Sequence, residues 1–365
     1  MTHRSLLAPL PGQRRRDAVS LAGMATVVLV LNVLGWGVLN LVVVPQGLSV
    51  GNAGVFGLGL GVTAFLLGVR HAFDADHIAA VDNATRKLVG EGRHALSAGF
   101  WFSLGHSSVV FGLSLILAVG WGAVVGHVVN PESDLQQALG TFGAVVAGAF
   151  LVLIGLTNLA ALSGIIGVLR GMRSGALDEA ALERHLHNRG VIARVLARFT
   201  RRVRHPRHLY PIGLLMGLGL DTATQVALLV LAGGTAALAL PWYAILVLPV
   251  LFAAGMTLFD ALDGVLMTRM YQWAIDAPRR RVYYNLAVTV VSVLAALGIG
   301  GAVLLQVLAE REALSVPLAW AMEVNLDSVG FALVGLFVLM WLVSVAAGRL
   351  GRERSDRADG APEIL

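Results

Sequence analysis

The chain has 365 residues, of which 57% are apolar and only 13% are charged. The charged share is about half that of a typical soluble domain. Together with a mean hydropathy of +0.77, it excludes a cytosolic enzyme, a disordered chain and a secreted disulfide scaffold. Cysteine is absent, which excludes a thiolate metal site and a cysteine nucleophile. Glycine, with 43 residues, is as abundant as in membrane helices, where small residues let backbones approach closely.

Apolar runs long enough to cross about 30 Å of hydrocarbon recur along the whole chain. The first follows Arg14, Arg15 and Arg16, a basic start that resembles a signal peptide. Its apolar stretch is longer than a signal core and no cleavage site follows, so we interpret it as an uncleaved membrane helix. The predicted spans lie near residues 21–44, 56–80, 97–125, 139–169, 209–232, 242–267, 283–308 and 326–347.

Positive charge alternates between the loops that join these eight spans. All but two of the 27 Lys and Arg residues lie in the N-terminal segment, in every second loop or in the C-terminal tail. The exceptions are Arg70, inside the second span, and Arg311, in an opposite loop. This is the positive-inside pattern. It predicts an all-α integral membrane protein with eight transmembrane helices and both termini cytoplasmic, and it explains the basic composition without a nucleic-acid partner.

The predicted organisation is one transmembrane domain with short cytoplasmic ends. An N-terminal cytoplasmic segment covers residues 1–20, the eight-helix domain covers 21–347, and a cytoplasmic tail covers 348–365. The long cytoplasmic loop, 170–207, is rich in arginine, and we expect it to face solvent or anionic lipid. Metal binding is the weaker interpretation of this loop region because its histidines are irregularly spaced, at His185, His187, His205 and His208.

Ionisable residues cluster inside the second span, at Arg70, His71, Asp74, Asp76 and His77. Each charge at membrane depth costs about 2.5–3.5 kcal/mol on insertion scales, so the cluster needs a function or a partner. On an ideal helix His71, Asp74 and His77 share one face, and two imidazoles with a carboxylate suit a divalent transition metal. Asp76 falls nearly opposite, so it contacts another helix or the helix is broken here. The structural alternative pairs Arg70 with Asp74 and lets the histidines donate to backbone carbonyls.

Three other spans also carry ionisable residues. The third holds His106, which alone is as consistent with an interior hydrogen bond as with a metal ligand. The fifth holds Asp221, which shares a face with Gln225. The sixth holds Asp260 and Asp263, which lie one turn apart and repel unless a cation or a proton lies between them.

Residues 70–78 read R-H-A-F-D-A-D-H-I and resemble the R-H-A-x-D-A-D-H-I signature of the nickel/cobalt transporter (NiCoT) family of membrane permeases. Three further segments, 102–110, 218–225 and 255–264, are similar to motifs of the third, fifth and sixth helices of that family. Two positions depart from the motifs: Gln225 stands in place of a glutamate and Ala261 in place of a threonine. The first departure removes a carboxylate and the second a hydroxyl that could orient Asp260.

The resemblance implies uptake of Ni²⁺ or Co²⁺ across the cytoplasmic membrane by a permease that is not an enzyme and hydrolyses no ATP. The metal is then the transported substrate, and no cofactor is expected. Membrane lipid is the other expected partner, and no obligatory protein partner is evident. The family's essential second-helix positions correspond to His71, Asp76 and His77. The full predicted set of metal-site residues is His71, Asp74, Asp76, His77, His106, Asp221, Asp260 and Asp263.

Three alternatives remain at this stage. An efflux permease of similar chemistry would be expected to carry a dense histidine tract in its cytoplasmic loop, and the four scattered histidines are not such a tract. An intramembrane metalloenzyme such as a di-iron oxidase would need repeated H-x-x-x-H or E-x-x-H pairs on several helices, and the sequence lacks them. The membrane subunit of an ABC-type importer would need a partner protein. Ligand chemistry alone does not distinguish Ni²⁺ from Co²⁺ or Zn²⁺.

Overall fold

A computed structural model of the chain describes residues 11–49, 55–118, 133–173, 203–218, 240–275 and 278–311, with single positions between 330 and 342. Within these ranges every regular element is helical, and the one extended pairing is an isolated bridge between Ser49 and Val55. The α-helices are α1 (Pro11–Val38), α2 (Leu58–Ala72), α3 (Ala75–Gly90), α4 (Ala98–Ala118), α6 (Asp134–Arg173), α9 (Tyr210–Gly217), α11 (Trp242–Ile275) and α12 (Pro278–Arg311). Shorter turns are η1 (Leu39–Val43), η2 (Val44–Gln46) and η4 (Pro206–Leu209).

Five helical stretches are long and apolar enough to cross a membrane. They coincide with the first, third, fourth, sixth and seventh predicted spans, so an all-helical protein with several membrane spans is confirmed over the described residues. Most of the fifth predicted span and most of the eighth lie outside those residues, and the total of eight stays a prediction. The five stretches are Arg15–Gln46, Ala98–Ile116, Gln137–Ala160, Trp242–Gln272 and Thr289–Ala309.

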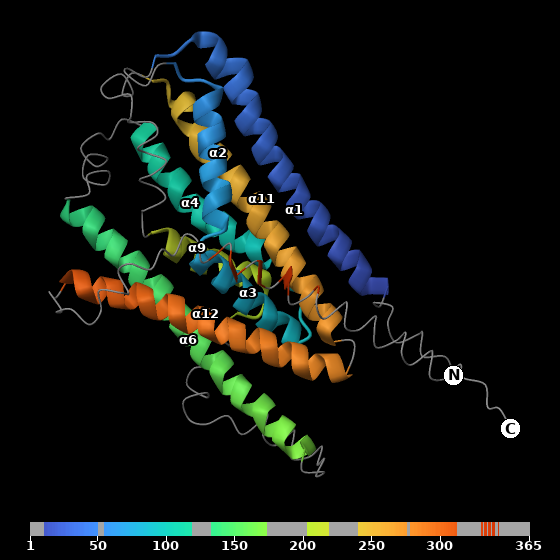
Figure 1. The fold of residues 1–365 in the computed structure, drawn as a ribbon. Helices are drawn as coiled ribbons and strands as arrows, with labels where there is room; N and C mark the ends of the chain where they lie inside the picture. Colours follow the sequence, from blue (N-terminus) through green and yellow to red (C-terminus); the bar gives the residue numbers. More distant parts are fainter. Residues whose placement is uncertain are drawn as a thin grey trace.

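Helix α11 is the centre of the bundle and packs against α1, α2, α3 and α4 (Figure 1). Of its apolar stretch, 72% is buried inside the protein, whereas the corresponding share for α1 is 17%. Buried side chains of α11, including Leu251, Phe252 and Met256, pack with Ala64 of α2. By contrast, α1 exposes Leu29 and other apolar side chains, a surface suited to lipid. A second pair, α6 and α12, cross in close contact (Figure 1).

Glycines let the central helices touch backbone to backbone. A β-carbon on Gly68 of α2 would overlap the carbonyl oxygen of Phe252 on α11. A β-carbon on Gly99 of α4 would likewise overlap the carbonyl oxygen of Asp260 on α11. Small residues of this kind are the usual device for close helix approach in membranes. As a result, α2 and α4 are both held tightly against the same helix, and their polar residues are brought near one another.

The second predicted span is not one continuous helix. Helix α2 ends at Ala72 and α3 begins at Ala75, so the ideal-helix geometry assumed for 56–80 is wrong and the broken-helix alternative is correct. Asp74 adopts an extended backbone conformation, with φ −65° and ψ 145°. Irregular backbone at membrane depth is tolerated where protein surrounds it. Here the backbone of Gly330 approaches the Phe73 carbonyl oxygen, and α3, most of whose residues are buried, packs against α11, α12 and α6.

Candidate metal centre

Three histidines meet at the break between α2 and α3. His71 lies in the last turn of α2, His77 in the first turn of α3, and His106 in α4. Each offers one ring nitrogen, and these ligand atoms all lie within 4.8 Å of one another. The Nε2 atoms of His71 and His106 are 3.0 Å apart. The structure therefore gathers two residues of the second predicted span and one of the third into a single cluster.

The break is what brings His71 and His77 together. On a continuous helix, residues six positions apart are separated by an axial rise of about 9 Å. In the structure the centroids of these two rings are only 4.4 Å apart. Both rings also approach His106, with centroid distances of 4.7 and 4.8 Å. The extended residue between the helices thus turns a helical stripe into a compact three-imidazole site.

Carboxylates orient two of the three rings. The Oδ2 atom of Asp74 lies 2.6 Å from Nδ1 of His71, and Oδ2 of Asp260 lies 3.3 Å from Nδ1 of His77. A histidine that donates its Nδ1–H to a carboxylate presents Nε2 as the metal ligand. Consistent with this, Nε2 of His77 is buried without a hydrogen-bond partner among the described residues, as is Nδ1 of His106. These contacts differ from the structural alternative, in which the histidines donate to backbone carbonyls.

The donor set fits a divalent transition metal. Imidazole nitrogens bind such ions at about 2.0–2.1 Å, so two nitrogens that bind the same ion lie roughly 3–3.5 Å from each other. The 3.0 Å between the Nε2 atoms of His71 and His106 matches that spacing, and the ligand atom of His77 lies within 4.8 Å of both. Imidazole ligands suit nickel and zinc as well as copper and iron. A mixed imidazole and carboxylate environment also compensates the charge of a dehydrated cation.

Aromatic side chains form the wall of the cluster. The ring of Phe102 meets that of His77 edge-on, with ring centroids 4.8 Å apart and an interplanar angle of 86°. The ring centroids of Phe252 and His71 are 5.9 Å apart. Both phenylalanines are buried. Sequence reasoning did not assign them to the site, although Phe102 precedes His106 by one helical turn and so shares its face. An apolar wall excludes water and strengthens the electrostatic interactions inside the site.

Two predicted site residues, Asp76 and Asp263, lie apart from the three-histidine cluster, and a third is not described. The Oδ1 atom of Asp76 accepts a hydrogen bond from the His77 backbone N–H at 2.9 Å, in the first turn of α3. Asp263 lies one turn beyond Asp260, and both of its carboxylate oxygens are buried without a hydrogen-bond partner among the described residues. Asp221 lies outside the described residues, as does Gln225.

A second polar network, to which sequence reasoning gave no role, lies further along α3. The carboxylate of Asp82 accepts hydrogen bonds from the hydroxyl of Tyr271 on α11 and from that of Ser292 on α12, the latter at 2.8 Å. One turn later, Nη1 of Arg86 donates to the hydroxyl of Thr289 at 2.7 Å. The sequence signal was the spacing of an acid and an arginine four residues apart. This network joins α3 to two neighbouring helices.

The several apolar helices indicate a multi-pass membrane protein, and the three clustered histidines at its centre form a candidate site for a metal ion. Residues 57–347 match the sequence profile of NicO, the high-affinity nickel-transport protein family. The chain belongs to this family, a family of nickel transporters and not of enzymes, and the resemblance seen in the sequence motifs is thereby confirmed.

Similar proteins have been named for nickel and for cobalt. The chain is 49% identical over 341 residues to the nickel transporter NicT of Mycobacterium tuberculosis, an overlap that covers 93% of this chain and 91% of the relative. It is 43% identical to the nickel transporter NixA of Staphylococcus aureus, over 80% of this chain and 86% of the relative. It is 38% identical to the cobalt transport protein NhlF of Rhodococcus rhodochrous, over 94% of this chain and 95% of the relative. No solved structure is significantly similar to the chain.

Proposed function

We propose that this protein carries Ni²⁺ or Co²⁺ across the cytoplasmic membrane into the cell, as a permease that hydrolyses no ATP. The observation that carries the proposal is the meeting of three histidine ring nitrogens within 4.8 Å, at a helix break inside the protein. Membership of a nickel-transport family supports nickel as a substrate. The cobalt transporter among the relatives supports including cobalt.

In this proposal the ion exchanges hydration water for ligands of the cluster. His71, His77 and His106 supply nitrogen ligands, while Asp74 and Asp260 hold two of the rings and balance the positive charge. Asp76, Asp221 and Asp263 line or tune the path, without a ligand role assigned to each. The ion is the substrate, so its binding must be strong enough for capture and weak enough for release.

The membrane arrangement that we propose follows the charge pattern. Eight helices within residues 21–347 cross the membrane, and the segments 1–20, 170–207 and 348–365 lie in the cytoplasm. Lipid is the surrounding partner, and no obligatory protein partner is included. The five described apolar stretches support the helical part of this arrangement.

Uptake of radioactive ⁶³Ni²⁺ and ⁵⁷Co²⁺ by cells that express the full chain tests the proposal. We expect accumulation above that of empty-vector cells for at least one metal, and a protonophore added in parallel reports whether a proton gradient drives it. His77→Ala should abolish this accumulation while the protein remains in the membrane. His94→Ala is the matched control because His94 pairs instead with Asp17 on α1, with Nδ1 and Oδ1 3.1 Å apart. Accumulation below the empty-vector level would indicate efflux, and unchanged uptake by His77→Ala would contradict the assigned site.

A further inference from the structure

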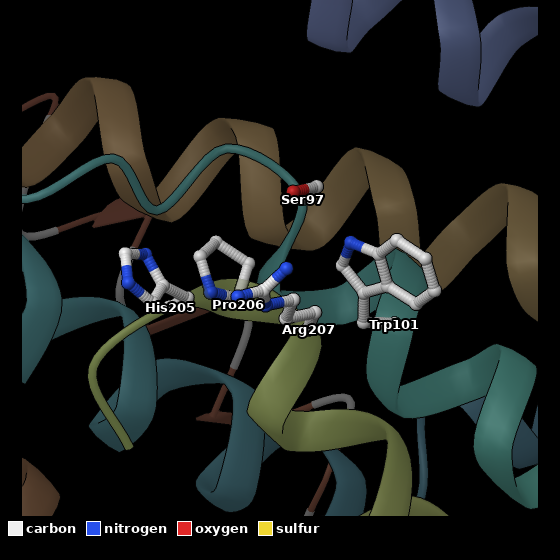
Figure 2. Close-up of a pocket in the computed structure, with 5 residues that line it drawn as sticks. All are labelled: Ser97, Trp101, His205, Pro206 and Arg207. Atoms are coloured by element: carbon white, nitrogen blue, oxygen red, sulfur yellow. The ribbon is translucent and has the colours of Figure 1, made fainter. Parts of the chain in front are cut away.

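A pocket unrelated to the histidine cluster opens where α4 and η4 begin. Its volume is about 290 Å³. Figure 2 shows the lining side chains: Trp101 comes from α4, His205, Pro206 and Arg207 come from η4 and the residue before it, and Ser97 lies on the segment that leads into α4. None of these residues belongs to the metal site or to the polar network of Asp82.

The pocket is rich in hydrogen-bond donors for which the described residues supply no acceptor. The guanidinium of Arg207, the indole N–H of Trp101 and the hydroxyl of Ser97 can all donate. Among the described residues, no side-chain hydrogen bond or ion pair engages these groups or the ring of His205. Arg207 and His205 are also exposed. An acceptor with several oxygens and a negative charge would satisfy this arrangement, because guanidinium forms paired hydrogen bonds with phosphate or carboxylate.

The surroundings of the pocket are positively charged. Nη1 of Arg93 donates to the Arg204 carbonyl oxygen at 2.9 Å. Nζ of Lys87 donates to the carbonyl oxygen of Val203 at 3.1 Å. The neighbouring acid, Glu91, is already paired with Arg93 at 2.9 Å. Partial desolvation and the charges of Arg207, His208, Arg93 and Arg204 lower the pKa of the His205 ring. The pocket thus has a cationic environment, in which no acid among the described residues forms an ion pair with Arg207.

The position of the pocket points to the membrane boundary. Helix α4 contains a candidate membrane span that starts at Ala98, one residue after Ser97. Helix α9 follows η4 directly and packs against α4. Trp101 therefore lies within the first turn of a span, at the depth where tryptophan is enriched in membrane proteins. The positive-inside pattern assigns this end of the span to the cytoplasmic side.

We propose that the pocket between α4 and η4 binds the phosphate group of an anionic lipid headgroup in the cytoplasmic leaflet. The guanidinium of Arg207 donates hydrogen bonds to the phosphate oxygens, and Ser97 and Trp101 donate further hydrogen bonds. The acyl chains of the lipid lie along the apolar surface of α4. A bound lipid would bridge the start of α4 and η4, the element at which the long cytoplasmic loop ends. Inorganic phosphate has the same anionic oxygens but lacks the chains, so the two sources can be separated.

Native mass spectrometry of the purified full chain in detergent, without added metal, tests this site. The probes are phosphatidylglycerol, phosphatidylcholine and inorganic phosphate. We expect Arg207→Gln to lower the affinity for phosphatidylglycerol about fivefold or more, as loss of one cation near an anionic membrane surface implies. Arg207→Lys should retain more of that affinity because it keeps the charge. Arg16→Gln is the matched control, since Arg16 is an exposed cation of α1, and it should leave the affinity unchanged.

A second measurement follows the His205 ring by NMR. Phosphatidylglycerol should raise the pKa of His205, since a bound phosphate stabilises the imidazolium, and Arg207→Gln should reduce this rise. Equal affinity of the wild type and Arg207→Gln for phosphatidylglycerol would overturn the proposal, as would an equal loss in Arg16→Gln. Inorganic phosphate that binds as tightly as the lipid would make the pocket a soluble-anion site and overturn the lipid assignment. Because no metal is present, these outcomes do not depend on the proposed transport.

Discussion

At the scale of single residues, the carboxylates beside His71 and His77 should set how tightly the cluster holds a metal. Asp260→Asn keeps the shape of the side chain but removes the negative charge that faces Nδ1 of His77 at 3.3 Å. Because loss of such a partner typically weakens metal binding about 10–100-fold, we expect a Ni²⁺ dissociation constant raised by that factor. Isothermal titration of the purified protein measures it.

The control for Asp260→Asn is Asp17→Asn. Asp17 also faces a histidine, His94, with Oδ1 and Nδ1 3.1 Å apart, but this pair lies outside the cluster and 41% of the His94 side chain is exposed. Asp17→Asn should therefore leave the affinity for Ni²⁺ at the wild-type value. If both variants bind Ni²⁺ as the wild type does, the buried carboxylate does not support the metal site.

The backbone contact at Gly99 predicts a second residue-scale effect. A β-carbon on this residue would overlap the Asp260 carbonyl oxygen, so Gly99→Ala must push α4 away from α11 and separate His106 from the other two histidines. We expect uptake of ⁶³Ni²⁺ to fall at least about tenfold when it is normalised to the amount of protein in the membrane.

Gly112→Ala provides the comparison for this change on the same helix. Nothing lies within 4 Å of a β-carbon built on Gly112, so this variant tests the loss of a glycine without a steric clash. Its uptake should match the wild type. Equal uptake by the two alanine variants would mean that the spacing of α4 and α11 does not control the site.

At the scale of elements, the hydrogen bonds of Asp82 should hold α3 in place. Tyr271→Phe removes the hydroxyl that donates to Asp82 and leaves a buried carboxylate oxygen without that partner. Interhelical hydrogen bonds of this kind contribute about 0.6 kcal/mol on average in membrane proteins, with a maximum of about 1.7. We expect a lower thermal unfolding midpoint in detergent.

Tyr243→Phe is the matched control because it also removes one tyrosine hydroxyl bond. Tyr243 donates to Oε1 of Gln46 at 2.8 Å in an exposed position, where water can replace the lost partner. This variant should unfold at the wild-type temperature. A destabilisation as large as that of Tyr271→Phe would show that burial of the Asp82 network adds nothing to its strength.

At the scale of the whole molecule, the charge pattern predicts the orientation in the membrane. A reporter fused within residues 170–207 should be active in the cytoplasm, and one fused near Asn130 should lie outside the cell. Paired reporters, one active only in the cytoplasm and one active only outside it, measure both positions. An external signal from the arginine-rich loop would contradict both the number of helices and their direction.

The class of protein and most of the cluster could be predicted from the sequence. Apolar length and alternating charge predict membrane helices because the bilayer imposes those requirements locally on every span. The cost of ionisable groups at membrane depth indicated His71, His77 and His106, and the signature motif indicated the family. These inferences hold because each depends on neighbouring residues and on the solvent, without knowledge of which helices touch.

The tertiary structure alone decided how those residues come together. Periodicity favoured one helix through 56–80, whereas the chain breaks at Phe73 and Asp74. Packing against distant parts of the chain, such as Gly330 against the carbonyl of Phe73, makes this irregular backbone tolerable at membrane depth. The pairing of His77 with Asp260 across 183 residues depends on the packing of α3 against α11. Long-range packing of this kind leaves no local periodic signal, so only the folded chain determines which carboxylate holds which imidazole.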